Sequence, residues 1–211
     1  MPDLLRTLLP ITALVVLALL VVAAPGDAAV KPRVLLVVPY DAASLGGDGQ
    51  WVGEGIAEIV RLGLAQHPAF VQLDTARLRQ FGQPEIWGDD AVQQAARALR
   101  ADAALFGRVV KSGTDYTIQP MLYDIKASGG DMLPLEPMTI PEADLMQRLP
   151  AVVVAYVRSM RIAPTDAELG RIEKAARPTR SLRAFELYAR SQQALRRGGQ
   201  EGNESAADLL S

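Results

Sequence analysis

The chain has 211 residues, of which 22 are basic and 24 acidic, and it contains one histidine and no cysteine. Hydrophobic residues make up 49% of the sequence, which is typical of a globular protein with room for one or two domains. The lack of cysteine excludes disulfides, thiolate zinc sites, iron-sulfur clusters and cysteine nucleophiles, and the single His67 excludes multi-histidine metal sites. The composition therefore favours a binding or scaffolding module over an enzyme.

The first thirty residues differ from the rest. Arg6 precedes an uncharged run, residues 7–24, which is followed by small and helix-breaking residues. This pattern predicts that residues 1–30 are a cleaved export signal and that the mature protein is periplasmic or secreted. The alternative is an uncleaved inner-membrane anchor facing the periplasm, because the run just spans the roughly 30 Å hydrocarbon layer. We expect no membrane contact outside residues 7–24, and no lipoprotein anchor, because no cysteine follows the run.

Residues 31–162 alternate between short apolar runs and helical patterns. The run 33–40 is apolar and β-branched, which predicts a strand buried on both faces. The elements predicted next are a helix over 51–66, a strand over 70–73, and a helix capped by Asp89 or Asp90 that ends at Arg100. Connections of this kind between parallel strands require helices packed against the sheet.

The pattern then changes to antiparallel strands. Ser112-Gly113-Thr114 predicts a hairpin turn between strands over 103–111 and 115–125. Pro120 predicts an incomplete ladder on one edge of the second strand, and two further prolines make 132–140 an edge strand. A helix is predicted over 141–161. The fold class is therefore α/β, a mixed sheet of about five strands flanked by helices in the order β-α-β-α-β-β-β-α, and the pattern leaves two or three layers open.

Helical patterns fill the C-terminal part. Residues 163–180 predict a linking helix and a breaker, and residues 181–211 predict a short α-helical hairpin with helices over 181–197 and 204–210. One hairpin cannot bury its own apolar face, and repeat arrays need about three units. We therefore expect either that the native chain continues beyond Ser211 or that this segment is loosely ordered.

Several segments together carry a family resemblance. These are Val34-Leu35-Leu36-Val37-Val38-Pro39-Tyr40, Gly53-Glu54-Gly55-Ile56, residues 101–109 and residues 116–124. They resemble the TolB amino-terminal-like domain over residues 31–162, and residues 177–188 are similar to the segment that leads into tetratricopeptide repeats. The resemblance implies a non-catalytic sensory or protein-interaction domain, often extracytoplasmic, and it supplies no catalytic residues. Residues 132–137 depart from the family pattern, which puts a partner at that edge in doubt.

The loop Ser44–Gly55 lies where a phosphate-binding loop would be. The glycine spacing is wrong for a dinucleotide fingerprint, and Asp48 and Glu54 would repel phosphate. A flexible loop that leads into a helix is therefore favoured. Its position after the carboxyl end of a strand nevertheless makes it the expected crevice for a small ligand.

Aromatic residues predict a possible binding surface. It comprises Trp51, Gly53, Gly55, Phe81, Trp87 and Tyr123. The alternative interpretation is that these aromatic side chains pack over the core as a lid. His67 precedes a proline at a helix end, where we expect its imidazole to meet free carbonyl groups.

Two functional hypotheses follow. The first is an exported, non-catalytic binding or scaffolding protein of the bacterial cell envelope that contacts a protein partner through the helical segment or a sheet edge. The second is a small-molecule or nucleotide sensor that uses the Ser44–Gly55 loop. Residues 158–197 hold ten basic and four acidic residues, which we interpret as solvated helix faces and not as a nucleic-acid site. No enzyme activity, cofactor or metal is expected.

Overall fold

The computed structural model describes residues 31–81, 87–126 and 130–210. The predicted export signal and residues 82–86, between Phe81 and Trp87, lie outside the described residues. The elements given below are those of the described part of the chain.

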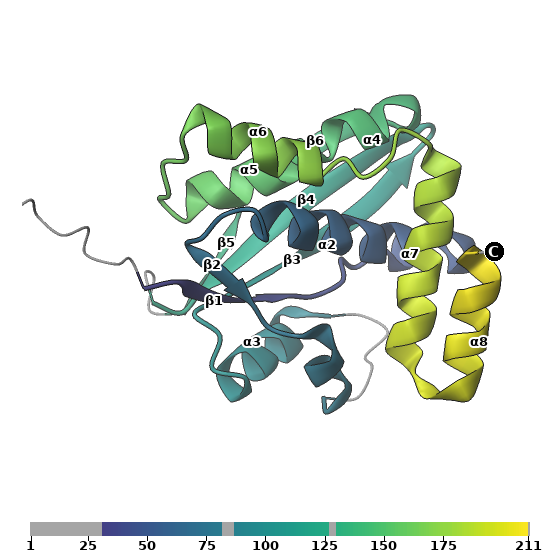
Figure 1. Cartoon of the computed structure of the whole chain (residues 1–211), viewed down its shortest axis with the longest axis horizontal. Coiled ribbons are helices and arrows are strands. Elements are labelled where there is room, and N and C mark those ends of the chain that lie inside the picture. Colours follow the sequence, from purple (N-terminus) through teal and green to yellow (C-terminus); the bar gives the residue numbers. More distant parts are fainter. Residues whose placement is uncertain (1–30, 82–86, 127–129, 211) are drawn as a thin grey trace, which may run out of the picture. The chain divides into compact units, whose positions relative to one another are not determined.

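A mixed sheet of six strands forms the centre of the fold (Figure 1). The strands are β1 (Arg33–Val37), β2 (Phe70–Gln72), β3 (Ala103–Ser112), β4 (Asp115–Asp124), β5 (Asp131–Pro134) and β6 (Met138–Pro141). Their order is β2-β1-β3-β4-β5, and β6 also pairs with β4. β1 is parallel to β2 and β3, whereas β4 is antiparallel to β3, β5 and β6. The predicted α/β class and mixed sheet are confirmed.

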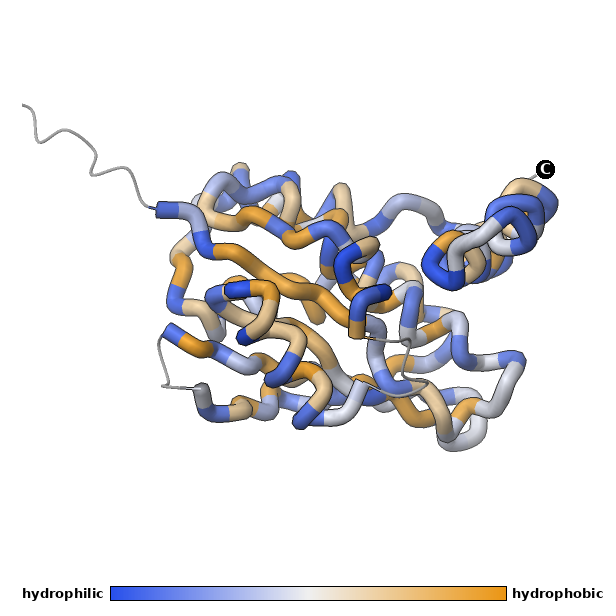
Figure 2. The backbone as a smooth tube through the Cα atoms, turned by 90° about the horizontal axis from the view of Figure 1, so that it is seen from below, coloured by the Kyte–Doolittle hydropathy of each residue, from blue (hydrophilic) through white to orange (hydrophobic). Residues whose placement is uncertain are grey.

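Helices cover both faces of the sheet. The α-helices are α2 (Trp51–Leu64), α3 (Asp89–Ala98), α4 (Leu145–Arg148), α5 (Pro150–Ser159), α6 (Asp166–Ala175), α7 (Leu182–Arg197) and α8 (Gly199–Leu210). Alternate β1 side chains enter two separate cores, Leu35 with α2, α5 and α6, and Leu36 with α3. Hydropathy is high along the strands between the helices and low along α7 and α8 (Figure 2). The domain therefore has three layers, which the sequence pattern left open.

The sheet edge formed by β5 and β6 differs from the prediction. One strand over 132–140 was predicted, but two short strands form on either side of Pro137. β5 pairs with residues 121–124 of β4 and β6 with residues 115–118. Neither strand reaches Pro120, which has no N–H group to donate on that side. The predicted interruption of the ladder at Pro120 is confirmed.

Helix boundaries differ where proline or glycine changes the backbone. The single helix predicted over 141–161 is wrong, because the segment forms a 3-10 turn, α4 and then α5, with Pro150 in the first turn of α5. Asp89 and Asp90 lie in the first turn of α3, and Gly88 is its N-cap. α8 begins at Gly199, five residues earlier than predicted, directly after the positive-φ residue Gly198 ends α7.

Other local predictions are confirmed. A two-residue turn with Gly113 at a φ of 59° joins β3 to β4. Ser181 caps α7, because its side chain accepts a hydrogen bond from the Ala184 N–H. The predicted linking helix is α6, which begins with a capping box formed by Thr165 and Glu168.

Candidate functional site

Helix α7, in the C-terminal part of the chain, crosses α2 and packs against it (Figure 1). Phe185 of α7 is 1% exposed, and its ring contacts Trp51 edge-on at 6.1 Å between centroids. Gly55 leaves room for this ring, since a Cβ atom at this position would lie 2.8 Å from the ring of Phe185. Phe185 and Ala189 therefore bury the apolar face of α7 against α2.

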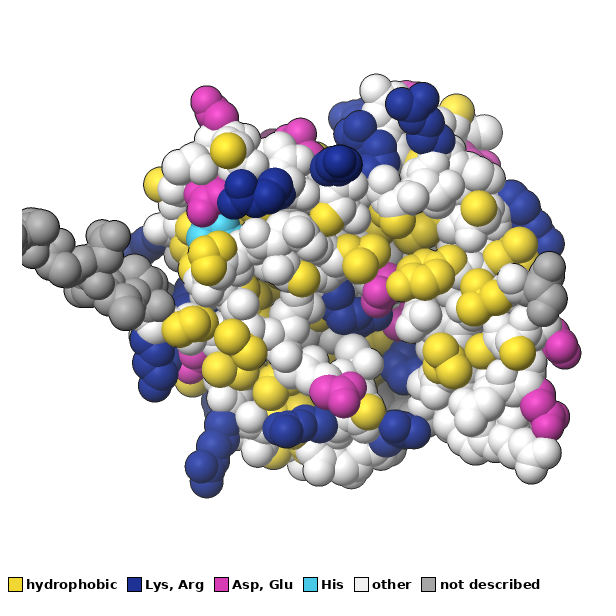
Figure 3. Space-filling model, in the orientation of Figure 1, with side chains coloured by type: hydrophobic (Ala, Val, Ile, Leu, Met, Phe, Trp, Pro, Cys, Tyr) yellow, Lys and Arg dark blue, Asp and Glu magenta, His cyan; other side chains and the backbone are white. Residues whose placement is uncertain are grey.

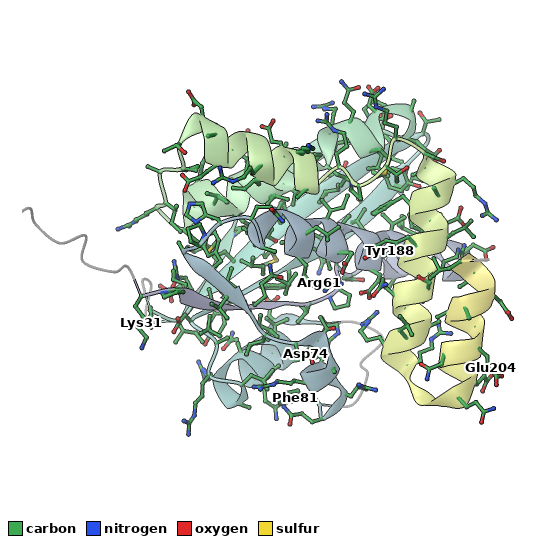
Figure 4. The ribbon with its side chains drawn as sticks, viewed as in Figure 1. Lys31, Arg61, Asp74, Phe81, Tyr188 and Glu204 are labelled. Carbon is green, nitrogen blue, oxygen red and sulfur yellow. The ribbon has the colours of Figure 1, made fainter. Side chains whose placement is uncertain are left out.

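An ionic network reinforces the contact between α2 and α7. Glu54 of α2 is 3% exposed; one carboxylate oxygen lies 2.9 Å from Arg61 and the other pairs with Arg196 of α7. Glu58 accepts hydrogen bonds from Arg61 and, at 2.7 Å, from the hydroxyl of Tyr188. Figure 4 shows Arg61 and Tyr188 approaching each other from the two helices. The buried carboxylate is thus compensated from both sides, as a buried charge requires.

Two members of the network, Tyr188 and Arg196, have shifted pKa values. Burial raises the pKa of Tyr188, and the hydrogen bond and negative charge of Glu58 raise it further. Burial lowers the pKa of Arg196, although the Glu54 carboxylate opposes this effect. A guanidinium remains protonated across the physiological pH range even so. Tyr188 and Arg196 therefore both donate to the α2 carboxylates at neutral pH.

A cavity of about 290 Å³ lies at the carboxyl end of β1, next to the interface with α7. The chain leaves β1 through α2 on one face of the sheet and reaches β3 through α3 on the other face. The carboxyl ends of β1 and β3 therefore form a topological switch point, the usual place for a ligand crevice in such sheets. The walls include Tyr40, Gln50, Glu54, Trp87, Gln193 and Arg197.

The backbone between β1 and α2 shapes this cavity. The N–H of Tyr40 donates to the carbonyl oxygen of Gly53 at 3.1 Å. A Cβ atom at position 53 would overlap the carbonyl oxygen of Tyr40, so only glycine permits this close approach. Within the part of the chain that the structure describes, the amides of Gln50 and Gln193 make no side-chain hydrogen bond. Both amides are available to a ligand in the cavity.

The six residues of the predicted binding surface do not form one surface. Trp51 belongs to the core under α2, whereas Tyr123 and Trp87 belong to the core under α3, against which Phe81 packs. Tyr123 is fully buried, so it cannot touch a partner. Gly53 permits the close approach of the Tyr40 backbone, and Gly55 permits the contact with the Phe185 ring. Of these six residues, Trp87 lines the cavity. The other aromatic residues fit the alternative interpretation, in which they pack in or over the core.

Sequence reasoning missed the contribution of α7 to the cavity. Gln193, Arg196 and Arg197 line it although they follow the loop by more than a hundred residues. The available signal was the spacing of Phe185, Tyr188 and Ala189 along one helix face, but that spacing does not identify the surface that the face covers.

His67 occupies a structural position. Its Nδ1 atom accepts a hydrogen bond of 3.1 Å from the N–H of Ala69, and its Nε2 atom lies 3.8 Å from a carboxylate oxygen of Glu168. The predicted contact with carbonyl groups is therefore wrong, because the imidazole accepts from an N–H group of the turn that follows α2.

The described residues contain no candidate metal site and no candidate membrane-spanning helix. Within residues 31–81, 87–126 and 130–210, no three histidine, aspartate or glutamate side chains are arranged to hold a metal ion. None of the helices formed by these residues is both long and apolar enough to cross a bilayer.

Comparisons with known proteins give low similarity. No protein-family model matches the chain, and no curated protein matches it. Similar solved structures include the C-terminal domain of LpoB from Salmonella enterica, with 17% identity over 55% of this chain and 87% of that chain and a TM-score of 0.40. Lipoprotein GNA1162 from Neisseria meningitidis gives 21% identity, 64% and 100% coverage, and a TM-score of 0.43.

TolB from Acinetobacter baumannii is also similar, with 15% identity and a TM-score of 0.45. The match covers 64% of this chain and 30% of the TolB chain, so this chain spans less than a third of that structure. The resemblance to the TolB amino-terminal-like domain and to the segment leading into tetratricopeptide repeats stays a prediction from the sequence motifs.

Proposed function

We propose that the chain is an exported, non-catalytic binding or scaffolding protein that contacts a protein partner in the bacterial cell envelope. The observation that supports partner binding most directly is the form of the two sheet edges. Export rests on the pattern of residues 1–30, which we propose to be a cleaved signal, with an inner-membrane anchor facing the periplasm as the alternative.

Both edges of the sheet offer backbone groups to an added strand. Among the described residues, no strand pairs with the outer edge of β2 or of β5. Each edge also carries an exposed aliphatic side chain, Val71 at 50% and Leu133 at 40% exposure. An extended peptide can bind such an edge through main-chain hydrogen bonds, with neighbouring apolar side chains adding affinity.

The helical hairpin of α7 and α8 offers a second contact surface. Leu195 of α7 and Leu210 of α8 are exposed although both are large and apolar. We propose that this hairpin begins a tetratricopeptide-like segment, supported by the similarity of residues 177–188 to the lead-in of such repeats. Helical repeats bind protein partners on extended concave surfaces, and exposed apolar side chains such as Leu195 and Leu210 can contribute to a surface of that kind.

A pull-down from periplasmic extract tests the proposal. Residues 31–211 are compared with Val71→Lys and Leu133→Lys variants, because a lysine on an edge strand disfavours strand addition. Gln80→Lys adds the same charge at an exposed position outside both edge strands and serves as the control. We expect one edge variant to reduce recovery of a defined partner about tenfold or more, while the control retains it. Recovery at background level by the unchanged chain, or turnover of a substrate, contradicts the proposal.

The cavity at the switch point favours a second candidate, a small-molecule or nucleotide sensor. Its support is the cavity of about 290 Å³ with the amides of Gln50 and Gln193 on its walls. A thermal-shift screen of nucleotides, sugars and peptides should find a ligand that raises the unfolding temperature by mass action. Gln193→Ala should weaken the effect. A flat response across the whole screen excludes this candidate and leaves the pull-down result unaffected.

A further inference from the structure

A second cavity, of about 200 Å³, lies between α2, α7 and the 3-10 helix η3 (Thr75–Arg79). Three arginines line it, one from each element: Arg61, Arg79 and Arg196. Glu54 and Glu58 are the acidic residues of its walls. In Figure 3, basic and acidic side chains meet in a recess near the middle of the face, where Figure 1 shows α2 meeting α7.

The two carboxylates do not balance the three guanidinium groups. Glu54 is shared by Arg61 and Arg196, and Glu58 binds Arg61 and Tyr188. Arg79 pairs with no carboxylate among the described residues; its Nε donates at 3.4 Å to the carbonyl oxygen of Ala76 in its own 3-10 helix. Within the described part of the chain, the exposed guanidinium of Arg79 therefore has no carboxylate partner on the wall of the cavity.

Arg61 also has a guanidinium nitrogen without an acceptor among the described residues. The Nη1 atom of Arg61 is buried and makes no hydrogen bond to any described residue, although the other two nitrogens of this side chain bind Glu54 and Glu58. A buried N–H donor without an acceptor is costly and rare in folded proteins, and its usual explanation is a bound water or ion. The cavity has room for several waters at about 30 Å³ each, and therefore for a small polyatomic anion.

We propose that this cavity binds a phosphate group, either free or as a small ester, with Arg61 and Arg79 as its principal donors. Phosphate presents oxygens in four directions, so it can accept from guanidinium groups on different elements, whereas a carboxylate presents two oxygens in one plane. Its negative charge compensates the charge of Arg79. This site shares no residue with the edge strands β2 and β5 of the proposed function, and it adjoins the cavity at the switch point, with which it shares Glu54 and Arg196.

Bound phosphate would accept hydrogen bonds from Arg79 of η3 and Arg61 of α2, and so would link these two elements next to the contact between α2 and α7. A ligand held by donors from separate elements binds the folded chain and not the unfolded chain, so it raises the unfolding temperature in proportion to its occupancy. This property provides a direct readout that needs no knowledge of a biological partner.

The test is thermal unfolding of the purified chain at constant ionic strength, with sodium chloride replaced stepwise by sodium phosphate, glycerol phosphate or sodium acetate. We expect a saturable rise in unfolding temperature with phosphate and none with acetate. Arg79→Gln should raise the phosphate concentration at half-saturation about tenfold or more. Arg77→Gln, at an exposed position of the same 3-10 helix outside the cavity, should leave that concentration unchanged.

The comparison of inorganic phosphate with glycerol phosphate distinguishes the possible sources of the phosphate group. Tighter binding of glycerol phosphate assigns the site to an ester, and tighter binding of inorganic phosphate assigns it to the free ion. No saturable rise with either, an equal rise with acetate, or a response that Arg79→Gln leaves unchanged would overturn the proposal.

Discussion

Two buried tyrosines, Tyr40 and Tyr156, connect the segment after β1 to α5 and β3 beside the cavity at the switch point. The hydroxyl of Tyr156, on α5, donates to the carbonyl oxygen of Phe106 on β3 at 2.5 Å. Because its single hydrogen is used there, Tyr40 must donate to Tyr156, also at 2.5 Å. Gly107 leaves room for the ring of Tyr40, which a Cβ atom would overlap. Burial raises the pKa of both tyrosines, so both hydroxyls stay protonated.

Removal of the Tyr156 hydroxyl should therefore destabilise the fold. Tyr156→Phe leaves the Phe106 carbonyl and the Tyr40 hydroxyl without partners, and we expect a loss of about 1–3 kcal/mol in the free energy of unfolding. Tyr40→Phe should cost less, because Tyr156 still donates to Phe106. Urea unfolding followed by circular dichroism measures both. If Tyr40→Phe costs as much as Tyr156→Phe, the assigned direction of the two hydrogen bonds is wrong.

Asp102 links the amino ends of the central strands. It accepts hydrogen bonds from the N–H of Val34 at 2.8 Å and from Lys126 at 2.7 Å. Burial raises the pKa of Asp102, but the Lys126 and Val34 contacts lower it by more, so the net pKa is below its usual value. The folded state therefore prefers the ionised carboxylate. Its contribution to stability is complete above the unfolded pKa, about 3.9, and decreases as the pH falls toward the folded pKa.

Asp102→Asn should change how stability depends on pH. We expect lower stability than the unchanged chain at pH 7 and a smaller loss between pH 4 and the acidic limit of folding, since the substituted group no longer titrates. The free energy of unfolding measured at a series of pH values checks this. Asp208→Asn removes an exposed carboxylate of α8 and is the control. Parallel pH curves for Asp102→Asn and the unchanged chain would contradict the prediction.

The elements themselves were largely predictable because their signals are local. The apolar run of β1, the Gly113 turn and the Ser181 cap each depend on neighbouring residues, and all three were correct. Errors occurred at prolines: Pro137 lies between β5 and β6, and Pro150 begins α5 as a helix distinct from α4. At such residues the sequence indicates an interruption. Tertiary packing decides whether the proline only distorts one element or divides it into two.

Two glycines on helices should respond in opposite ways to alanine. Gly55→Ala would force the Phe185 ring away from α2, and we expect a loss of about 1–3 kcal/mol in the free energy of unfolding. Gly170 of α6 is exposed, with nothing within 4 Å of a Cβ atom there. Gly170→Ala should stabilise by about 0.4–1 kcal/mol, because alanine has less backbone entropy to lose. Urea unfolding of both variants checks the contrast, and a neutral Gly55→Ala would contradict the contact between α7 and α2.

The arrangement of the whole molecule was less predictable than its parts. The sheet class and the crevice after β1 followed from the order of the strands, whereas the packing of α7 on α2 did not. Glu58 and Tyr188 are 130 residues apart in the sequence, and no local pattern indicates which face of the domain an amphipathic helix covers. The residues of the predicted binding surface show the same dependence on tertiary packing, since Trp51 and Gly55 both contact Phe185 of the distant helix α7.

Both cavities have α7 as one wall, so both depend on its position against α2. The chain has no cysteine, so an engineered pair is free of competing thiols. A Cβ atom at Gly55 would lie 3.3 Å from the Cβ atom of Ala189, slightly closer than in a relaxed disulfide. A small shift of α7, together with a displacement of the Phe185 ring that a Cβ atom at position 55 would crowd, would therefore allow the bond between cysteines at these two positions.

The most direct test of this position is oxidation of a Gly55→Cys, Ala189→Cys double variant, followed by mass spectrometry of the digested monomer. We predict an intramolecular disulfide between positions 55 and 189. A control pair, Gly55→Cys with Arg183→Cys on the exposed side of α7, should stay reduced under the same conditions. Absence of the 55–189 disulfide, or equal cross-linking of the control pair, would contradict the docking of α7 on α2 and with it both cavities.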